Sequence, residues 1–423
     1  MNRAAVCVAA LLLAASAARA DDLLQLWGQA RQADPQLRQA AALSGAQDAA
    51  ARVARAALLP QWSLNASEQR GGGHLHTATS SLSQALLDLP ALREWQASQR
   101  DASAQQLRLQ AAEQDARARL AEAYFGLLSA QARLATARAN EQAFDRQVHE
   151  AEVRFKTGLA AQVEAEQSRT YRELAHSSTL AAELAVADAR EALAELTGTE
   201  PGALQPLAEA FSAQPLRDGV DAWITRALQA NPGLLALAQD EQASGRRIEG
   251  ARAGHLPTLS LGVDTTRQRG DGVSSLDAGR TPTVVGLRLT VPLFAGGATS
   301  AAADRATFQR EAVREQLEAG RRALQREVRA QYQAVAQGEA QLRAAQAALD
   351  AAQRSLEATR TGLTLGTRTT TDLLLAIQTL GQAQNARTDA RHRHVLALLA
   401  LHRAAGSLDD PELATVNALL ETR

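Results

Sequence analysis

Apolar and polar residues alternate along three short stretches of the chain. Every second residue is apolar between Thr258 and Asp264 and again between Val284 and Leu293. The stretch from Trp62 to Ser67 alternates in the same way. A period of two places apolar side chains on one face of a strand and polar side chains on the other. We therefore predict two β-hairpins, over residues 61–88 and 258–294.

Long segments without interior proline follow each predicted hairpin. Residues 90–198 and 297–405 are rich in Ala, Gln, Arg and Glu, and glycine-containing turns interrupt them at Phe155–Gly158 and Gly362–Gly366. These residue types are strong helix formers, and apolar residues recur in both segments at helical spacing. We predict that each segment is a long helical hairpin.

The two halves of the chain repeat the same order of elements. Ala30–Pro35 matches Ala227–Pro232, and further along Gly158 falls on Gly366. Each repeat begins with a helical segment that ends at a Leu-Pro pair, where proline stops the helix. The chain is therefore predicted to begin with a signal peptide (1–20) and a first repeat (21–198). A linker (199–219), a second repeat (220–406) and a tail (407–423) follow.

The first twenty residues have the features of a signal peptide. A positive residue, Arg3, precedes an apolar run from Val6 to Ala14, and Ala18-Arg19-Ala20 fits a cleavage site. The single cysteine of the chain, Cys7, lies in this segment. We expect an exported protein whose mature chain has neither a disulfide nor a thiolate metal site.

Composition narrows the class of protein. The chain of 423 residues is 46% hydrophobic but only 3% aromatic, and its formal net charge is −1. A balanced charge gives no reason to expect nucleic-acid binding. No segment beyond residue 20 is long and apolar enough for a transmembrane helix. Four strands cannot close a barrel alone, but the strands of three copies would supply twelve. The alternative is an ordinary soluble sheet with one solvent-exposed face.

Several junctions resemble those of the TolC family of outer-membrane efflux proteins. The resemblance covers nearly the whole mature chain, in order and in both repeats. Ala56–Pro60 and Ala251–Pro257 resemble the family's helix-to-strand junctions, and Val291–Gly297 resembles its strand-to-helix corner. Arg154–Leu159 and Gly366–Leu374 resemble its two coiled-coil turns.

The resemblance implies a fold and a function. The fold would be mainly α with a small β part: a homotrimeric twelve-stranded outer-membrane β-barrel that continues into a long α-helical coiled-coil tunnel in the periplasm. The linker and the tail would form an equatorial belt. The trimer would be the exit duct of a tripartite efflux or type I secretion system and would conduct small molecules or proteins passively. Its partners would be outer-membrane lipid, a periplasmic adaptor (membrane fusion protein) and an inner-membrane RND or ABC transporter.

The resemblance also places a gate at the periplasmic end of the tunnel. Glu164 and Asp372 are repeat equivalents just past the two turns, and Arg368 precedes Asp372 by one helical turn. We expect three Asp372 carboxylates to ring the constriction and Arg368 to bond Glu164 of a neighbouring coil. The alternative is that all three are solvated charges at helix ends.

The two turns themselves are candidates for adaptor docking, because a partner can reach the tip of a hairpin. These candidate residues are Arg154, Phe155, Gly158, Leu363 and Gly366. Gly158 and Gly366 are also expected to end their helices in the cap conformation that glycine favours, whether or not an adaptor docks there.

No motif in the chain predicts catalysis, a cofactor or a metal site. His74 and His76 flank one residue of a hairpin loop, and His392 and His394 are two apart on a predicted helix and cannot share a face. We therefore expect no enzyme activity. Two other classes remain as alternatives: a soluble periplasmic coiled-coil adaptor and an exported hydrolase with helical decoration.

Overall fold

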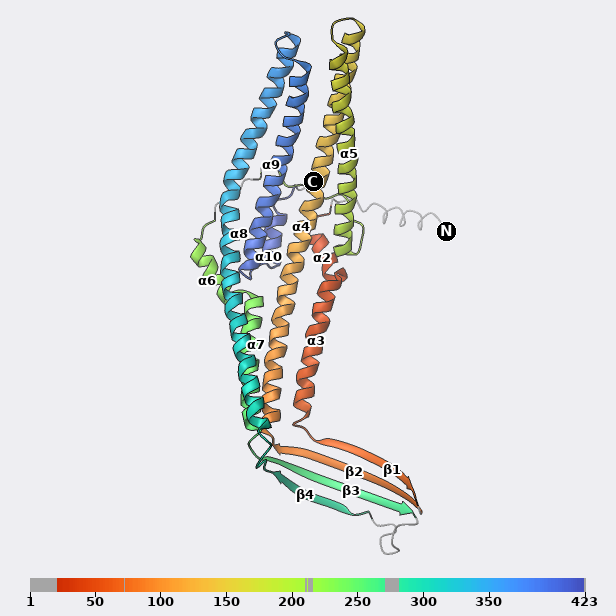
Figure 1. The fold of residues 1–423 in the computed structure, drawn as a ribbon, viewed down its shortest axis with the longest axis vertical. Helices are drawn as coiled ribbons and strands as arrows, with labels where there is room; N and C mark the ends of the chain where they lie inside the picture. The colour runs from red at the N-terminus through yellow and green to blue at the C-terminus, as the bar shows by residue number, and fades with distance from the viewer. Residues whose placement is uncertain (1–20, 72, 210, 212–215, 271–280, 422–423) are drawn as a thin grey trace, which may run out of the picture. The chain divides into compact units, whose positions relative to one another are not determined.

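The computed structural model describes residues 21–71, 73–209, 211, 216–270 and 281–421 (Figure 1). The predicted signal peptide lies outside the described residues, as do parts of the predicted linker and the end of the tail.

The helices follow the same order in both repeats. The first repeat contains α2 (Leu23–Ala33), α3 (Pro35–Ala56), α4 (Leu89–Lys156) and α5 (Gln162–Thr197). The second contains α6 (Val220–Ala230), α7 (Pro232–Ala253), α8 (Ala298–Thr364) and α9 (Thr370–Ala404), and α10 (Asp410–Asn417) follows. Figure 1 shows α4 running beside α5, and α8 beside α9.

The single helical segment expected before each hairpin is two helices. The break falls at Asp34 and Asn231, which have ψ angles of 115° and 117° and each precede a proline. Proline disfavours the helical conformation in the residue before it. Asp34 then caps α3, because its Oδ1 accepts a hydrogen bond of 2.8 Å from the Gln36 N–H.

The described chain forms two compact units. The first comprises residues up to Arg38, Ala112–Asn231 and Leu324 onward, and the second comprises Gln39–Ala111 and Pro232–Ala323. The second unit therefore contains the whole sheet together with α7, most of α3 and one part each of α4 and α8.

The core of the first unit joins α4 to the linker. Tyr124 is fully buried, and its hydroxyl donates a hydrogen bond of 2.7 Å to the Gln205 carbonyl oxygen. Burial raises the pKa of this phenol far above its ordinary value. Isolated β-bridges join Asp21 to Leu204 and Leu207 to Leu420, so the linker contacts both the start and the end of the described chain.

The four strands form one antiparallel sheet in the order β1-β2-β3-β4. The strands are β1 (Gln61–Arg70), β2 (His74–Leu87), β3 (Thr258–Gly270) and β4 (Thr283–Thr290). The two hairpins, which come from different repeats, are joined by the pairing of β2 with β3. β1 and β4 are consequently the edges of the sheet.

The register gives the sheet one apolar and one polar face, because opposite residues in an antiparallel pair share a face. The apolar face carries Trp62, Leu64, Leu82, Leu259, Leu261, Val263, Val285, Leu287 and Leu289. The polar face carries Ser63, Asn65, Ser81, Ser83, Ser260, Asp264 and Arg288. Trp62 is 78% exposed and Leu287 68% exposed, so no residue that the structure describes covers the apolar face at those positions.

His392 is a buried titratable group in the first unit. Its Nδ1 lies 2.7 Å from the Ser129 hydroxyl, and its ring lies 5.3 Å from that of Phe125. Burial lowers the pKa of His392 from 6.5 to about 4, and the charge of neighbouring Arg391 contributes in the same direction, against the opposing Asp389.

We expect this burial to make the protein less stable in acid. Between pH 6.5 and about 4 the unfolded chain binds a proton at His392 that the folded chain does not, so the free energy of unfolding falls as pH falls through that window. The shift corresponds to a loss on the order of 3 kcal/mol. Thermal midpoints at pH 7 and pH 4.5 should therefore differ more for the wild type than for His392→Gln. The exposed His149 provides the control, since H149Q should keep the wild-type difference; an equal difference in H392Q would contradict this account.

Candidate functional site: the turns of the helical hairpins

The turn between α4 and α5 ends α4 with a glycine in the left-handed conformation. Gly158 has φ +75°, and its N–H donates to the Phe155 carbonyl oxygen at 3.0 Å. The Leu159 N–H donates to the Arg154 carbonyl oxygen at 2.7 Å. These two bonds form a Schellman motif, which satisfies carbonyls at a helix end. Arg154, Phe155 and Gly158 thus lie together on an exposed turn.

The turn between α8 and α9 has the same geometry. Gly366 has φ +73°, and its N–H donates to the Leu363 carbonyl oxygen at 3.1 Å. The Thr367 N–H donates to the Gly362 carbonyl oxygen at 2.8 Å. The repeat equivalence of Gly158 and Gly366 therefore extends to the hydrogen bonds.

The two turns differ in the apolar side chains that they expose. Phe155 is 44% exposed, but its repeat equivalent Leu363 packs against a buried cluster. The buried members of this cluster are Phe144, Ala175, Leu356, Leu373, Leu374 and Ile377. At the tips, Leu159 and Leu365 are each 73% exposed. Neither leucine is among the docking residues predicted from the sequence, where the signal is an apolar residue directly beside the glycine that ends a helix.

α9 begins with a capping box that holds Asp372. The Thr369 hydroxyl accepts a hydrogen bond of 3.1 Å from the Asp372 N–H, and Asp372 Oδ2 accepts one of 2.9 Å from the Thr369 N–H. The Thr369 N–H, its hydroxyl and the nearby positive charge of Arg368 lower the pKa of Asp372 below its ordinary value. Asp372 is therefore a carboxylate at neutral pH, held in place by its own helix.

α5 begins differently, and this frees Glu164. The N-cap of α5 is Ala161, which has no side-chain oxygen, so no capping box forms there. The Glu164 Oε2 instead accepts a hydrogen bond of 3.3 Å from the Thr370 hydroxyl of α9. Beside it the Thr371 hydroxyl donates to Gln167 Oε1 at 3.0 Å. These two bonds join the first two turns of α5 to the first turn of α9, and we call them the tip contacts.

Arg368 makes no ion pair with any residue that the structure describes. Its side chain is exposed, and its Cγ lies against Gly362, where an added Cβ would be 2.6 Å away. One chain therefore brings Glu164 to Thr370 rather than to Arg368. A bond between Arg368 and the Glu164 of another copy stays a prediction.

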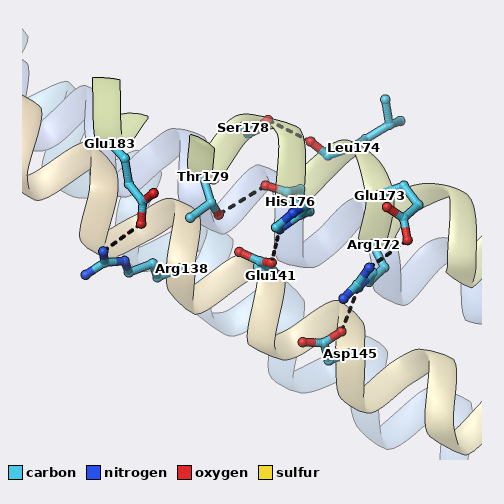
Figure 2. Close-up of polar contacts among 11 residues, drawn as sticks. Arg138, Glu141, Asp145, Arg172, Glu173, Leu174, His176, Ser178, Thr179 and Glu183 are labelled. Carbon is cyan, nitrogen blue, oxygen red and sulfur yellow. Dashed lines mark hydrogen bonds and ion pairs between the residues drawn. The ribbon is translucent and has the colours of Figure 1, made fainter. Parts of the chain in front are cut away.

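Below the tip, a row of charged pairs links α4 to α5, and Figure 2 shows the part of the row formed by Arg138, Glu141 and Asp145 of α4. Arg138, Asp145 and Glu152 recur every seven residues of α4, the period of a coiled coil. Their partners on α5 are Glu183, Arg172 and Arg169, at 2.7, 3.0 and 2.7 Å.

A fourth pair in the row joins Glu141 to His176, with Glu141 Oε1 lying 2.7 Å from His176 Nδ1. Hydrogen bonds from Thr179 and from His176 lower the pKa of Glu141. Together the four pairs connect α4 and α5 along the stretch from Arg138 to Glu152.

The described part of the chain contains neither a metal site nor a helix suited to cross a membrane. It holds no cluster of three or more His, Cys, Asp or Glu side chains placed to bind a metal ion. Nor does any helix there combine the length and the apolar character that crossing a membrane requires. His392 and His394 are both buried and serve the packing of α9.

Comparison with known proteins decides the family. The family model described as outer membrane efflux protein matches residues 26–199 and 223–407, that is, both repeats. The chain belongs to this family of outer membrane efflux proteins. It is 31% identical to the outer membrane protein TolC of Vibrio cholerae, over 98% of this chain and 97% of that protein. It is 29% identical to the alkaline protease secretion protein AprF of Pseudomonas aeruginosa, over 81% of this chain and 72% of that one.

Solved structures share the fold. The CmeC outer membrane channel of Campylobacter jejuni superimposes with a TM-score of 0.82 at 18% identity, covering 94% of this chain and 90% of that one. The open state of the Neisseria gonorrhoeae MtrE outer membrane channel gives a TM-score of 0.78 at 21% identity, covering 92% and 90%.

Membership in the efflux family confirms several predictions from sequence. The fold class is that of the trimeric TolC-like channels, in which a small sheet from each chain contributes to a barrel and the helices form a tunnel. The chain is an exit duct of the cell outer membrane that extends into the periplasm. Its relatives are channels rather than enzymes.

Proposed function

We propose that three copies of this chain close a twelve-stranded barrel and a helical tunnel through which substrates leave the periplasm. The observation that supports this proposal is the sheet. Its edge strands β1 and β4 have no further partner strand in the described chain, and its apolar face is bare. An unpaired edge cannot stay in lipid, because its backbone N–H and C=O groups would lose their hydrogen bonds. Pairing β4 of one copy with β1 of the next satisfies every edge.

The assembly is tested by the mass of the detergent-solubilised particle and by the environment of Trp62. We expect a trimer, and we expect Trp62 fluorescence to be quenched by lipids with brominated acyl chains after reconstitution. Trp62→Phe should remove the quenched component, because Trp62 is the tryptophan on the apolar face. A monomer recovered in the soluble periplasmic fraction would instead favour a soluble adaptor.

The partners in this proposal are a periplasmic adaptor and an inner-membrane RND or ABC transporter, which supplies the energy. The adaptor would dock on the exposed turns, where Phe155 and Arg154 of one hairpin and the Gly366 turn of the other are accessible. Leu363 would act indirectly there, by holding the second turn against the buried cluster. A passive duct needs no cofactor.

We place the gate of the duct at the N-terminal ends of α5 and α9. Three copies of Asp372 would form an acidic ring at the constriction, and the capping box would keep each carboxylate ionised and fixed. A ring of carboxylates attracts cations and repels anions at close range. The tip contacts of Glu164 with Thr370 would hold the coils in the closed arrangement.

Asp372→Asn should reduce cation selectivity, measured as the reversal potential of the reconstituted channel in a KCl gradient. The selectivity of the wild type should persist into acid, because the Asp372 pKa is lowered, and should be lost as pH falls through that lowered pKa. Arg368→Ser should leave the sign of the selectivity unchanged and increase conductance if Arg368 bonds a neighbouring copy. Unchanged reversal potential in D372N together with unchanged conductance in R368S would reduce both residues to solvated helix-end charges.

A further inference from the structure

The apolar face of the sheet ends in basic side chains at the hairpin end of the strands. These residues lie on the same face as Trp62 and Leu261, and we call them the basic rim: Arg70, His74, His76, Arg267 and Arg269. All five are exposed. The rim is thus continuous with the surface that faces lipid in the proposed barrel.

The register brings the members of the rim together across three strands. His76 of β2 lies opposite Arg269 of β3 on one side and Glu68 of β1 on the other. One row nearer the helices, Ala78 lies opposite Arg267. The small side chain of Ala78 leaves a hollow in the sheet surface, lined by Ala66, Glu68, His76, Ala78, Arg267 and Arg269 among others.

The charge of the rim is only partly neutralised within the described chain. Glu68 pairs with Arg70, whose Nε lies 2.7 Å from the Glu68 Oε1. Arg267 and Arg269 form no ion pair with any described residue. Two guanidinium groups next to a hollow are suited to bidentate contacts with phosphate oxygens.

The opposite face of the sheet lacks this arrangement. Its charged residues on β3 and β4 are Asp264 and Arg288, which have opposite signs. The concentration of arginine and histidine on the apolar face therefore does not follow from a generally basic sheet. The grouping of these basic side chains on the lipid-facing side indicates a role specific to that side.

The distance between the rim and the helix end of the sheet matches a membrane. From Leu259 to Arg267 a strand extends about 26 Å at ~3.3 Å per residue. With a tilt of about 40°, this corresponds to roughly 20 Å along the membrane normal, close to the apolar band of an outer-membrane barrel, which is about 25 Å tall. The helices leave the sheet at the periplasmic end, so the rim lies at the level of the outer-leaflet headgroups.

We propose that the basic rim binds the phosphate groups of an anionic lipid in the outer leaflet. In this inference, which rests on the proposed barrel, Arg267 and Arg269 contact the headgroup phosphate and His76 lines the hollow. The acyl chains lie along Val263 and Leu261 below. The occupant is a lipid rather than a soluble phosphate, because the face that carries the basic rim also carries the exposed Trp62 and Leu64, which acyl chains would cover.

The test uses the full-length channel purified in neutral detergent, with native mass spectrometry as the readout. The probe is lipid A with two phosphates, and the comparisons are phosphatidylcholine and sodium phosphate. The variant Arg267→Gln/Arg269→Gln should bind lipid A at least about tenfold more weakly than the wild type, since each arginine near an anionic surface contributes about fivefold in affinity. The matched control is Arg288→Gln, which removes an exposed arginine from the opposite face of the same sheet.

Support for the rim requires that R288Q binds lipid A like the wild type and that phosphatidylcholine does not distinguish the variants. Equal lipid A binding by wild type and double variant would overturn the inference, as would an equal loss in R288Q or equally tight binding of free phosphate. Channel conductance is recorded on the same preparations. If the wild type conducts but binds lipid A no more tightly than the double variant, the lipid site is refuted and the proposed function is not. If the wild type forms no conducting trimer, the proposed function is refuted.

Discussion

Gly406→Ala is expected to destabilise the first unit by about 3 kcal/mol or more. Gly406 follows α9 with φ +74°, a conformation that costs a residue with a Cβ about 1–2 kcal/mol. An added Cβ would also lie 2.5 Å from the Ala230 carbonyl oxygen and 2.7 Å from the Asn231 Cα, both backbone atoms that cannot rotate away. The resulting shift of α6 against α9 adds the cost of overpacking, about 1–3 kcal/mol. The measurement is the thermal midpoint of the purified channel.

The control for this substitution is Gly366→Ala. Gly366 has almost the same φ, +73°, but nothing lies within 4 Å of its added Cβ. G366A should therefore show only the backbone cost and a smaller drop in the thermal midpoint. If both variants lose equal stability, the close contact between Gly406 and Ala230 does not matter and the argument from packing fails.

Thr370→Val should open the tunnel. The substitution removes the hydroxyl that donates to Glu164 and keeps the shape of the side chain. A hydrogen bond to a charged group contributes about 1.5–3 kcal/mol, and the length of this one, 3.3 Å, reduces its contribution to about 1 kcal/mol in each copy. Three copies acting together would shift the ratio of open to closed channels by about 3 kcal/mol, or roughly a hundredfold. Single-channel recording should show a higher mean conductance than the wild type.

Thr371→Val, which removes the other tip contact, is the matched control for Thr370→Val. It also removes a hydroxyl of α9, but its partner Gln167 is neutral and exposed, so the effect on opening should be smaller. Glu164→Gln should fall between T370V and the wild type, because an amide oxygen still accepts the bond. Equal mean conductance in T370V and the wild type would remove Glu164 from the gate.

The repeated pattern made much of the fold predictable from sequence. Alternation marked three of the four strands, and helical spacing in proline-free segments marked the long helices, because both periods reflect which side chains must face an apolar environment. β2 shows no such alternation and was predicted only as the second arm of a hairpin. The matching of Glu164 with Asp372 also placed both carboxylates one turn into a helix, as the structure has them.

The partners of these residues could not be predicted, because they depend on single departures from the repeat. Ala161 stands where the second repeat has Thr369, so α5 has no capping box, and Glu164 bonds across to α9 instead. Likewise Leu363 and Phe155 are equivalent in sequence, but only Leu363 packs against the buried cluster. The pairing of β2 with β3 joins two repeats that are far apart in sequence. No local pattern therefore reveals that this pairing places the histidines of β2 beside the arginines of β3 in the basic rim.

Three copies of the sheet should assemble into a conducting duct when the purified full-length protein is added to a planar lipid bilayer. Single-channel recording should then show discrete steps of conductance from a trimeric preparation, with cation selectivity that Asp372→Asn reduces. No current from a preparation shown to be monomeric would mean that the chain does not form such a duct.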